Sequence, residues 1–363
     1  MKKITLEHQP SDSFYQEIID VLNHGGVIAF PTDTVYGLGV DATNRDAIDK
    51  IYRIKRRGEK KPLSLFLDRR DRIKDFAFVK NRKVIEFLLP GPLTVVYWAK
   101  ESCPIKTPDR SIGIRIPQVP WLLEIIKRYG KPLATTSANL SDEEPIASPL
   151  KIAEIFFDLD LLIDGGPKHG LPSTVLDLRS NFPTVLRKGK ISFLEIEKAI
   201  SRLVKLGSEA TFNILFVCTG NSCRSPMAQG ILRGLVSDPR VIIESCGISA
   251  TENGTAADYA QQVVKMFGWD ISSHRTKPLT KDLVNQSDLI LCMELKHFER
   301  VLELVPGAAL KTFLLKEYKR GPVIKNQVPD PIGKDLKAYQ ESAKVMFPSL
   351  KVLQRELEIR LDP

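Results

Sequence analysis

Cys218 stands where a nucleophile could meet a bound anion. The run ILFV at 214–217 predicts a buried strand, which delivers the cysteine to a short polar loop that ends at Arg224. Ser225-Pro226 then opens a predicted helix. Strand, loop and helix N-terminus in this order form an anion cradle, because unpaired backbone N–H groups and the positive helix end face one point. The pattern predicts attack of sulfur on phosphorus.

The composition of the loop favours this chemistry. Gly220 and Asn221 permit the backbone turns that aim successive N–H groups inward. The helix terminus and the Arg224 guanidinium both favour a thiolate, so we expect Cys218 to be ionised near neutral pH. A small, half-buried cysteine at a strand end is the alternative that the spacing alone leaves open.

The string CTGNSCRS at 218–225 resembles the phosphate-binding loop of the low-molecular-weight cysteine phosphatases, and the resemblance runs through residues 211–363. It implies that Cys218 and Arg224 act on the phosphoryl group. It also implies that Asp330, in VPDPIG, protonates the leaving group and then activates water against a phosphocysteine. The supporting residues that it implies are Thr219, Gly220, Asn221, Ser222, Cys223, Ser225, Ser245 and His274, with Cys223 able to form a reversible protective disulfide.

The residues around this loop bear on the substrate. Tyrosine-specific members of that family carry a bulky aliphatic residue before the second loop cysteine and aromatic residues after Asp-Pro. This chain has Ser222 and Ile332-Gly333 at those places. Together with TFLLKEY at 312–318, they resemble the bacterial branch that acts on phosphoarginine, which implies a protein arginine phosphatase, with tyrosine specificity as the alternative.

A second group of polar and cationic side chains follows strand-like runs in the first two hundred residues. Side chains at the ends of neighbouring strands can point into one cleft. Lys55 and Arg57 belong to a short cationic run, and Arg187 follows an apolar run. Arg115 lies between apolar neighbours, which predicts a definite anionic partner for its guanidinium.

These segments resemble the YrdC-like threonylcarbamoyl-AMP synthases across nearly all of residues 5–200, in the short form of that family. The matching motifs, in chain order, are PTDTVYGLG, the Lys-x-Arg at 55–57, PGPLT, Arg115, TSANLS, STVLD and Arg187. The family joins L-threonine, bicarbonate and ATP into threonylcarbamoyl-AMP and releases pyrophosphate. The product feeds threonylcarbamoyladenosine modification of tRNA.

The resemblance implies two groups of binding residues and no dedicated acid–base catalyst. The threonine pocket would use Thr32, Arg115, Ser137 and Ser173. The ATP site would use Lys55, Arg57, Asn139, Ser148 and Arg187. Cations of this kind neutralise a triphosphate, and Arg can clamp a carboxylate in two-pronged fashion. ATP is expected as a substrate with Mg²⁺, and no tightly bound cofactor or protein-held metal is expected.

Alternating helix-like and strand-like stretches position these residues, so the fold class is α/β with two domains. We expect residues 1–205 to form a twisted mixed-sheet domain and residues 211–363 to form a doubly wound, parallel-sheet phosphatase domain. Between them, residues 191–206 predict one helix that ends at Gly207, since glycine suits a helix C-terminus.

Composition sets the broad class. The net charge is +9, aromatic residues make up 7% of the chain, and the five cysteines show neither a disulfide framework nor a zinc pattern. No apolar stretch approaches membrane-spanning length, and no leader sequence is evident. We therefore expect a cytoplasmic protein with no membrane partner. Its expected partners are small substrates, phosphorylated proteins, the tRNA threonylcarbamoyl-transfer machinery and tRNA itself.

Two other readings of the first half remain open. Asp142 stands where the synthases have glycine after SANLS, so the first half could be a non-catalytic RNA- or nucleotide-binding module. A carbamoyltransferase role, as in larger hydrogenase-maturation relatives, is the weaker alternative, because acylphosphatase and zinc-finger regions are not recognisable here.

Overall fold

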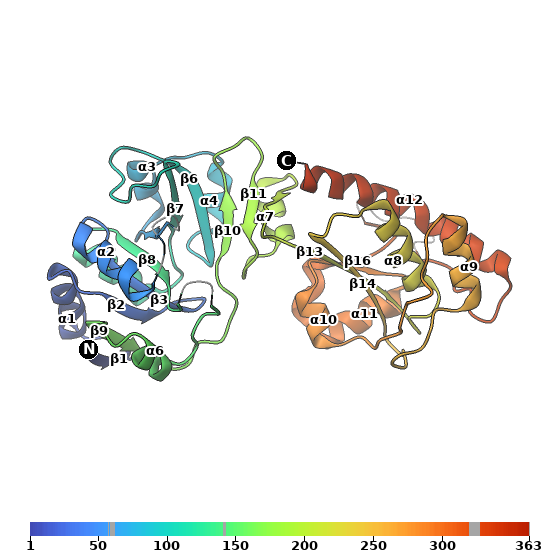
Figure 1. Ribbon diagram of the computed structural model, residues 1–363, viewed down its shortest axis with the longest axis horizontal. Coiled ribbons are helices and arrows are strands. Elements are labelled where there is room, and N and C mark those ends of the chain that lie inside the picture. The colour runs from blue at the N-terminus through green and yellow to red at the C-terminus, as the bar shows by residue number, and fades with distance from the viewer. Residues whose placement is uncertain (57, 59–61, 141–142, 319–326, 363) are drawn as a thin grey trace. The chain divides into compact units, whose positions relative to one another are not determined.

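The computed structural model describes residues 1–56, 58, 62–140, 143–318 and 327–362. The chain divides into two compact units, Met1–Gly207 and Ser208–Pro363. Each unit has its own sheet and its own core (Figure 1), and each is described by itself.

The first unit is built on one large mixed sheet. Among the described residues its strands run in the order β1-β9-β2-β3-β8-β4-β7-β6-β10-β11-β12, with β5 paired to β6. The strands are β1 Lys2–Thr5, β2 Ile28–Pro31, β3 Tyr36–Asp41, β4 Ser64–Phe66, β5 Ala77–Phe78, β6 Leu93–Ala99, β7 Ser111–Arg115, β8 Leu133–Ser137, β9 Leu161–Asp164, β10 Thr174–Asp177, β11 Thr184–Arg187 and β12 Lys205–Leu206. The sheet contains both parallel and antiparallel pairs, which confirms the predicted mixed α/β class.

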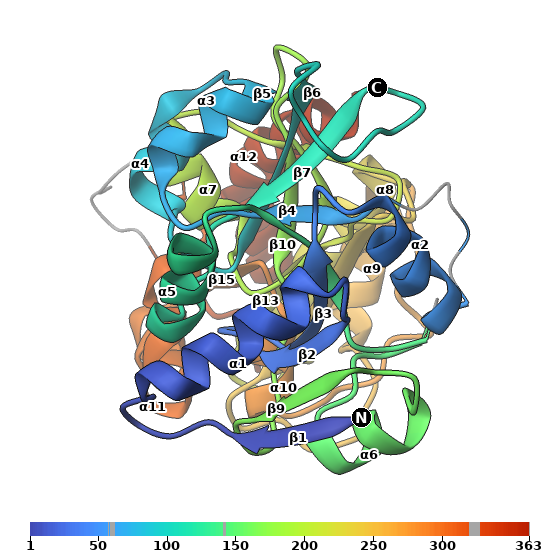
Figure 2. The ribbon, with the colours of Figure 1, turned by 90° about the vertical axis from the view of Figure 1, so that its left-hand side faces the viewer.

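Seven α-helices accompany this sheet in the described residues: α1 Asp12–Asn23, α2 Arg45–Ile54, α3 Ile73–Phe76, α4 Arg82–Leu88, α5 Pro120–Tyr129, α6 Pro149–Ile155 and α7 Phe193–Ile200. Helices α1 and α5 pack side by side against the sheet (Figure 2). Their apolar faces meet strand residues in one buried cluster that includes Ile18, Ile125 and Phe30. Ser11 caps α1 by accepting a hydrogen bond from the amide of Phe14 at 3.3 Å.

The helix predicted over residues 191–206 is shorter than expected. It ends at Ile200, because Ser201 takes a left-handed conformation with φ 58° at the C-cap. The residues beyond it return to extended structure, and Lys205–Leu206 pairs in parallel with β11. The last residues of this helix-like apolar pattern therefore form an edge strand of the sheet.

The second unit is a parallel α/β layer structure. Its sheet has the order β14-β13-β15-β16, and every strand pair is parallel. Helices α8, α9 and α12 contact one another on one side, while α10 and α11 contact the strands separately from that group. The strands are β13 Phe212–Cys218, β14 Val241–Gly247, β15 Leu289–Cys292 and β16 Thr312–Leu314; the helices are α8 Arg224–Leu235, α9 Asp258–Met266, α10 Lys281–Gln286, α11 Leu295–Leu304 and α12 Leu336–Leu361.

Strand β13 lies between β14 and β15, so its carboxyl end opens at the centre of the sheet edge. Leu215 and Val217 of this strand lie in a buried cluster with Cys292 of β15. A parallel strand buried on both faces reads as an apolar run, as residues 214–217 do. The core of the second unit thereby fixes the position of the residue that ends β13.

Candidate active sites

Cys218 is the last residue of β13, and helix α8 begins six residues later at Arg224. The intervening loop turns through Asn221, which takes a left-handed backbone conformation with φ 54°. Its amide then points back at the nucleophile, with the Asn221 N–H donating to Cys218 Sγ at 3.3 Å. The strand–loop–helix order predicted from the sequence is present, and it directs a main-chain donor to the sulfur.

The thiol of Cys218 is 2% exposed. Ser225 Oγ lies 2.9 Å from its sulfur. Burial raises the pKa of the Cys218 thiol, while the Ser225 hydrogen bonds, the Arg224 charge and the Asn221 amide act in the opposite direction. Burial thus opposes, and the loop donors favour, the thiolate that the sequence predicts, and its presence near neutral pH stays a prediction.

Arg224 is buried and lies among acceptors that the chain itself supplies. One terminal nitrogen donates to the Glu294 carboxylate and to the carbonyl of Val328, the latter at 3.1 Å. The other lies 2.5 Å from Asp330 Oδ2. Its Nε is buried with no hydrogen-bond partner in the described part of the chain. A phosphoryl oxygen bound at the loop could accept the hydrogen bond that this Nε–H is free to donate.

Asn221 connects the loop to the sheet behind it. Its side-chain nitrogen donates to Ser225 Oγ at 3.0 Å and to Ser245 Oγ at 2.9 Å. The ring of His274 lies 2.9 Å from the Asn221 carbonyl oxygen, through Nε2. The structure thus brings together Asn221, Ser225, Ser245 and His274, which the sequence had grouped only by resemblance.

Three further residues at this site were not found from the sequence: Glu294, His297 and Tyr339. Glu294 follows β15, so it reaches the same sheet edge as the end of β13. The Glu294 amide donates to His297 Nδ1 at 3.0 Å, which leaves Nε2 to donate to Thr219 Oγ1 at 2.9 Å. Burial and the Arg224 charge lower the pKa of His297 to about 4, so the ring is neutral near pH 7. The carboxyl end of a neighbouring parallel strand was the signal that could have indicated Glu294.

Both polar and apolar side chains lie at the rim of the loop. Ser222 is half-buried, and its Oγ lies 3.5 Å from Cys223 Sγ. The hydroxyl of Tyr339, on α12, lies 3.3 Å from the same sulfur. In the Asp-Pro loop, the amide of Ile332 donates to Asp330 Oδ1 at 3.2 Å, and the Ile332 side chain is 62% exposed. The loop therefore presents an exposed aliphatic side chain beside the candidate acid.

The first unit contains a cleft of about 370 Å³ at the ends of its central strands. Its lining includes four of the predicted threonine-site residues and one ATP-site residue: Thr32, Arg115, Ser137, Ser173 and Arg187. A cleft of this size fits a small substrate. The structure therefore brings together residues that lie as far apart in the sequence as Thr32 and Arg187.

Arg115 has the anionic partner that its apolar neighbours predicted. One of its terminal nitrogens lies 2.5 Å from Asp33 Oδ1 and donates to Thr34 Oγ1 at 3.1 Å. Arg115 Nε and Asp33 Oδ2 are buried with no hydrogen-bond partner in the described residues. The pair therefore retains both a donor and an acceptor for a zwitterionic ligand such as an amino acid.

The predicted ATP-site residues are divided among three places. Lys55 is fully buried and donates to the Ser137 carbonyl and to Asn139 Oδ1, the latter at 3.3 Å. Arg187 donates to the carbonyl of Ser173 at 3.0 Å from the cleft wall. Ser148 does not line the cleft but caps α6, accepting from the Lys151 amide at 3.5 Å. Arg57 and Asp142 lie outside the described residues.

Neither unit offers a built metal site in the part of the chain that the structure describes, where no group of three or more His, Cys, Asp or Glu side chains could hold an ion. Among those residues, likewise, no helix combines the length and apolar character needed to cross a bilayer. The functional polar residues instead lie in the cleft of the first unit and the phosphate loop of the second.

Family models match both units. The Sua5/YciO/YrdC model, described as "Telomere recombination", matches residues 20–189. The model "Low molecular weight phosphotyrosine protein phosphatase" matches residues 213–360.

Three similar proteins illustrate these matches. "Threonylcarbamoyl-AMP synthase" from Mus musculus is 38% identical over 167 residues, which are 43% of this chain and 60% of the mouse protein. "Putative threonylcarbamoyl-AMP synthase" from Methanocaldococcus jannaschii is 35% identical over 183 residues, 49% of this chain and 86% of that protein. The solved structure "YwlE arginine phosphatase from Geobacillus stearothermophilus" is 32% identical with a TM-score of 0.39, covering 41% of this chain and 94% of that one. The chain thus spans about 60% of the length of the mouse relative.

Proposed function

We propose that this chain, which belongs to the Sua5/YciO/YrdC family through residues 20–189 and carries a low-molecular-weight phosphatase domain at residues 213–360, is a bifunctional enzyme. The first unit would make threonylcarbamoyl-AMP, and the second would hydrolyse phosphoarginine in proteins. The observation that carries the phosphatase half is the placement of Cys218 Sγ 2.9 Å from Ser225 Oγ, beside the Asn221 amide and Arg224.

The loop residues suit a two-step phosphoryl transfer. In the first step the Cys218 thiol releases its proton to solvent and the Asp330 carboxylate takes one up. The sulfur then attacks phosphorus while the bond from phosphorus to the leaving nitrogen breaks, and Asp330 gives its proton to that nitrogen, so that the guanidino group of arginine departs. In the second step Asp330 takes a proton from water, which attacks the phosphocysteine and releases inorganic phosphate and the free sulfur. Arg224 and the loop amides hold the phosphoryl oxygens in both steps.

The preference for phosphoarginine rests on the rim residues. Ser222 is small enough to leave room for a planar guanidinium beside the loop, and Ile332 gives the Asp-Pro loop an aliphatic rather than an aromatic side chain. The alternative, a tyrosine phosphatase, predicts stacking on an aromatic side chain at that position. Parallel assays with phosphoarginine and phosphotyrosine peptides separate the two, and a strong preference for phosphotyrosine would refute the assignment.

Two variants make this assay specific. Cys218→Ser removes the nucleophile, so phosphate release should fall by about 10⁴-fold or more while pyrophosphate release by the first unit is unchanged. Ser222→Ile fills the space beside the loop, so it should reduce phosphoarginine hydrolysis more than phosphotyrosine hydrolysis. If Ser222→Ile affects both substrates equally, the rim residue does not select the leaving group.

The synthase half rests on the Arg115–Asp33 pair and the cations around the cleft. Arg115 would hold the threonine carboxylate, and Lys55 and Arg187 would hold ATP, which arrives with Mg²⁺. Carboxylation of the threonine amine by bicarbonate and attack of that carbamate on the α-phosphate would release pyrophosphate. The product would pass to the machinery that modifies tRNA.

Pyrophosphate release tests the synthase half directly. We expect release only when L-threonine, bicarbonate and ATP are all present. A folded protein that binds ATP but releases no pyrophosphate under these conditions would instead be the non-catalytic nucleotide-binding module.

A further inference from the structure

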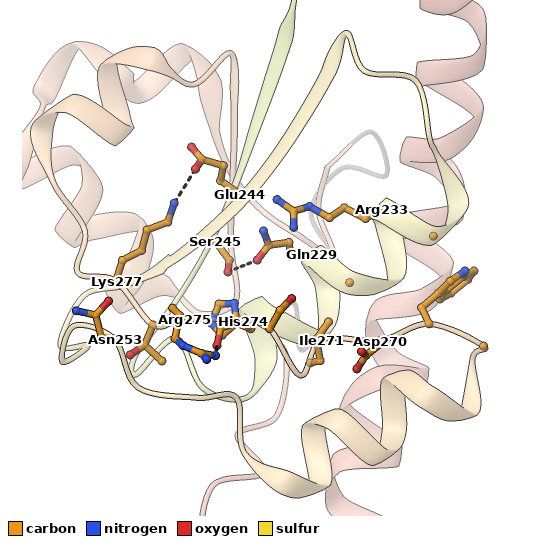
Figure 3. Close-up of a pocket in the computed structure, with 16 residues that line it drawn as sticks. Gln229, Arg233, Glu244, Ser245, Asn253, Asp270, Ile271, His274, Arg275 and Lys277 are labelled. Carbon is orange, nitrogen blue, oxygen red and sulfur yellow. Dashed lines mark hydrogen bonds and ion pairs between the residues drawn. The ribbon is translucent and has the colours of Figure 1, made fainter.

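A cavity in the phosphatase unit lies on the side of the loop where Ser245 and His274 contact Asn221. It has a volume of about 720 Å³ and is formed by helix α8, strand β14 and residues 268–277 (Figure 3). Its lining includes neither Cys218, Arg224 nor Asp330. The proposed phosphatase chemistry therefore leaves this cavity unassigned.

Two glycines of α8 allow the cavity wall to approach the helix. A Cβ at Gly230 would lie 2.3 Å from Ile271, and one at Gly234 would lie 2.0 Å from the Trp269 indole. Both distances are shorter than any real contact, so only glycine permits the 268–271 segment to pack here. The wall is thus a packed structure that holds Trp269 at the edge of the cavity.

Cationic side chains from separate elements line this cavity. Arg233 comes from α8, while Arg275 and Lys277 come from the segment that precedes α10, and Figure 3 shows Arg275 beside His274. Burial lowers the pKa of His274, and the charges of Lys277, Arg233 and Arg275 lower it further. The three cations therefore line one cavity with His274, and each disfavours a protonated ring.

Two of these cations lack a carboxylate. Lys277 pairs with Glu244 at 2.6 Å. Arg233 donates only to the Ile243 carbonyl, and Arg275 donates only to the carbonyls of Ser272 and His274, within the described residues. The carboxylates of Glu244 and Asp270 also line the cavity, so three cations face two carboxylates there, and this excess of positive charge favours an anionic ligand.

The cavity also touches the residue that holds the nucleophile. His274 lies 2.9 Å from the Asn221 carbonyl, and the Lys277 amide donates to Asn221 Oδ1 at 2.9 Å. Ser245, which also lines the cavity, accepts from the Asn221 side chain. A ligand bound in the cavity can therefore affect Cys218 through Asn221, because the Asn221 amide donates to the Cys218 sulfur.

We propose that this cavity binds a compact phosphate-bearing anion and that its occupancy changes the reactivity of the catalytic loop through His274 and Asn221. A bound anion offsets the charges of Arg233 and Arg275, so the pKa of His274 rises and its hydrogen bond to the Asn221 carbonyl strengthens. The binding claim is independent of the proposed phosphatase activity, whereas the effect on reactivity rests on that activity.

Trp269 gives a direct measurement of binding. The chain has three tryptophans, and Trp269 alone lies in the second unit, so a Trp98→Phe/Trp121→Phe background isolates its fluorescence. We titrate this protein with inorganic phosphate, diphosphate and AMP, whose relative affinities show whether the bare group or a nucleotide is preferred. A saturable change is expected with at least one of them, and no change with any of them at millimolar concentration would overturn the proposal.

Paired variants distinguish this cavity from the catalytic loop. Arg275→Gln, at an exposed position, should weaken binding by at least tenfold, whereas Arg224→Lys should leave the Trp269 response intact. Ser222→Asp, which places a negative charge on the catalytic rim, serves as a second block if Arg224→Lys does not fold. The reverse pattern would assign the anion to the catalytic loop and refute the cavity.

The link to the loop has its own measurement. In NMR titrations the pKa of His274 should rise when the anion is bound, and phosphate release from a phosphoarginine peptide should change in wild type but not in Arg275→Gln. Anion binding without either change would refute the coupling. An inactive phosphatase would refute the proposed function and leave the fluorescence result readable.

Discussion

Arg224 and Asp330 form an ion pair across the catalytic loop, with Nη2 and Oδ2 2.5 Å apart. The pair joins the guanidinium that would bind the phosphoryl group to the carboxyl that would protonate the leaving group. An incoming phosphoryl group carries oxygens that compete with the Asp330 carboxylate for the same donor. Substrate binding is therefore expected to release Asp330 toward the leaving atom.

Asp330→Asn tests this exchange. We expect kcat for a phosphoarginine peptide to fall by about 10²- to 10⁴-fold, because the leaving nitrogen no longer receives a proton. The loss should be much smaller for p-nitrophenyl phosphate, whose leaving group departs without protonation. Inorganic phosphate should also inhibit more strongly, since the Asp330 carboxylate no longer competes for Nη2 of Arg224. Asp282→Asn, at an exposed position on α10, is the control. An equal loss on both substrates would count against general-acid catalysis.

Ser225→Ala tests the effect of the Ser225 hydroxyl on the Cys218 thiol. This hydroxyl opposes the rise that burial causes in the pKa of Cys218, so its removal should raise that pKa further. The pH profile of inactivation by iodoacetamide should then move to higher pH, and inactivation at neutral pH should be slower than in the wild type. Ser249→Ala, at an exposed position, should not change the profile. A profile that moves to lower pH would contradict the assigned role.

The buried ring of His297 predicts a loss of stability in acid. Its pKa is about 4 in the fold, whereas the unfolded chain takes up that proton near the ordinary value of 6.5. The unfolded state therefore binds more protons between these values, and the free energy of unfolding falls as pH drops through this window. The effect should reach about 3 kcal/mol at the acid end of this window.

Urea unfolding at several pH values, followed by Trp269 fluorescence, checks this result. His297→Gln keeps a hydrogen-bonding side chain that does not titrate, so its stability should vary less with pH than that of the wild type. His8→Gln, at an exposed position, is the control and should match the wild type. Parallel pH curves for His297→Gln and wild type would exclude the ring as the cause.

Arg115→Lys tests the first unit. Lysine keeps the charge but loses the planar fork that engages Asp33 and Thr34 together, so the KM for threonine should rise by about tenfold or more. Asp33→Asn should also raise the KM for threonine, because Asp33 orients the Arg115 guanidinium. Pyrophosphate release with threonine and ATP varied separately gives both constants, and phosphatase activity should be unchanged. A rise confined to the KM for ATP would move Arg115 to the nucleotide side.

The sequence predicted the strand–loop–helix structure around Cys218 well, because these elements are local. Residues 218–225 are contiguous, and strand, turn and helix signals agree along them. Glu294 and His297 were missed because their positions depend on the pairing of β15 with β13, which no local pattern specifies. Arg115 was predicted to have an anionic partner, but the identity of Asp33 depends on bringing together residues 82 positions apart.

One prediction was wrong for a physical reason that local patterns do not contain. Residues 191–206 have helical apolar spacing, yet the left-handed Ser201 ends the helix and residues 205–206 pair with β11 instead. This outcome is set by tertiary structure.

The environment of Asn221 restricts which amino acids evolution can accept there. The position needs a left-handed backbone at φ 54°, a side-chain nitrogen for Ser225 and Ser245, and a side-chain oxygen for the Lys277 amide. Aspartate keeps the oxygen but has no nitrogen, and glycine keeps only the backbone freedom. In a saturation library selected for phosphatase activity, this codon should return asparagine alone, while the neighbouring Ser222 tolerates several small replacements.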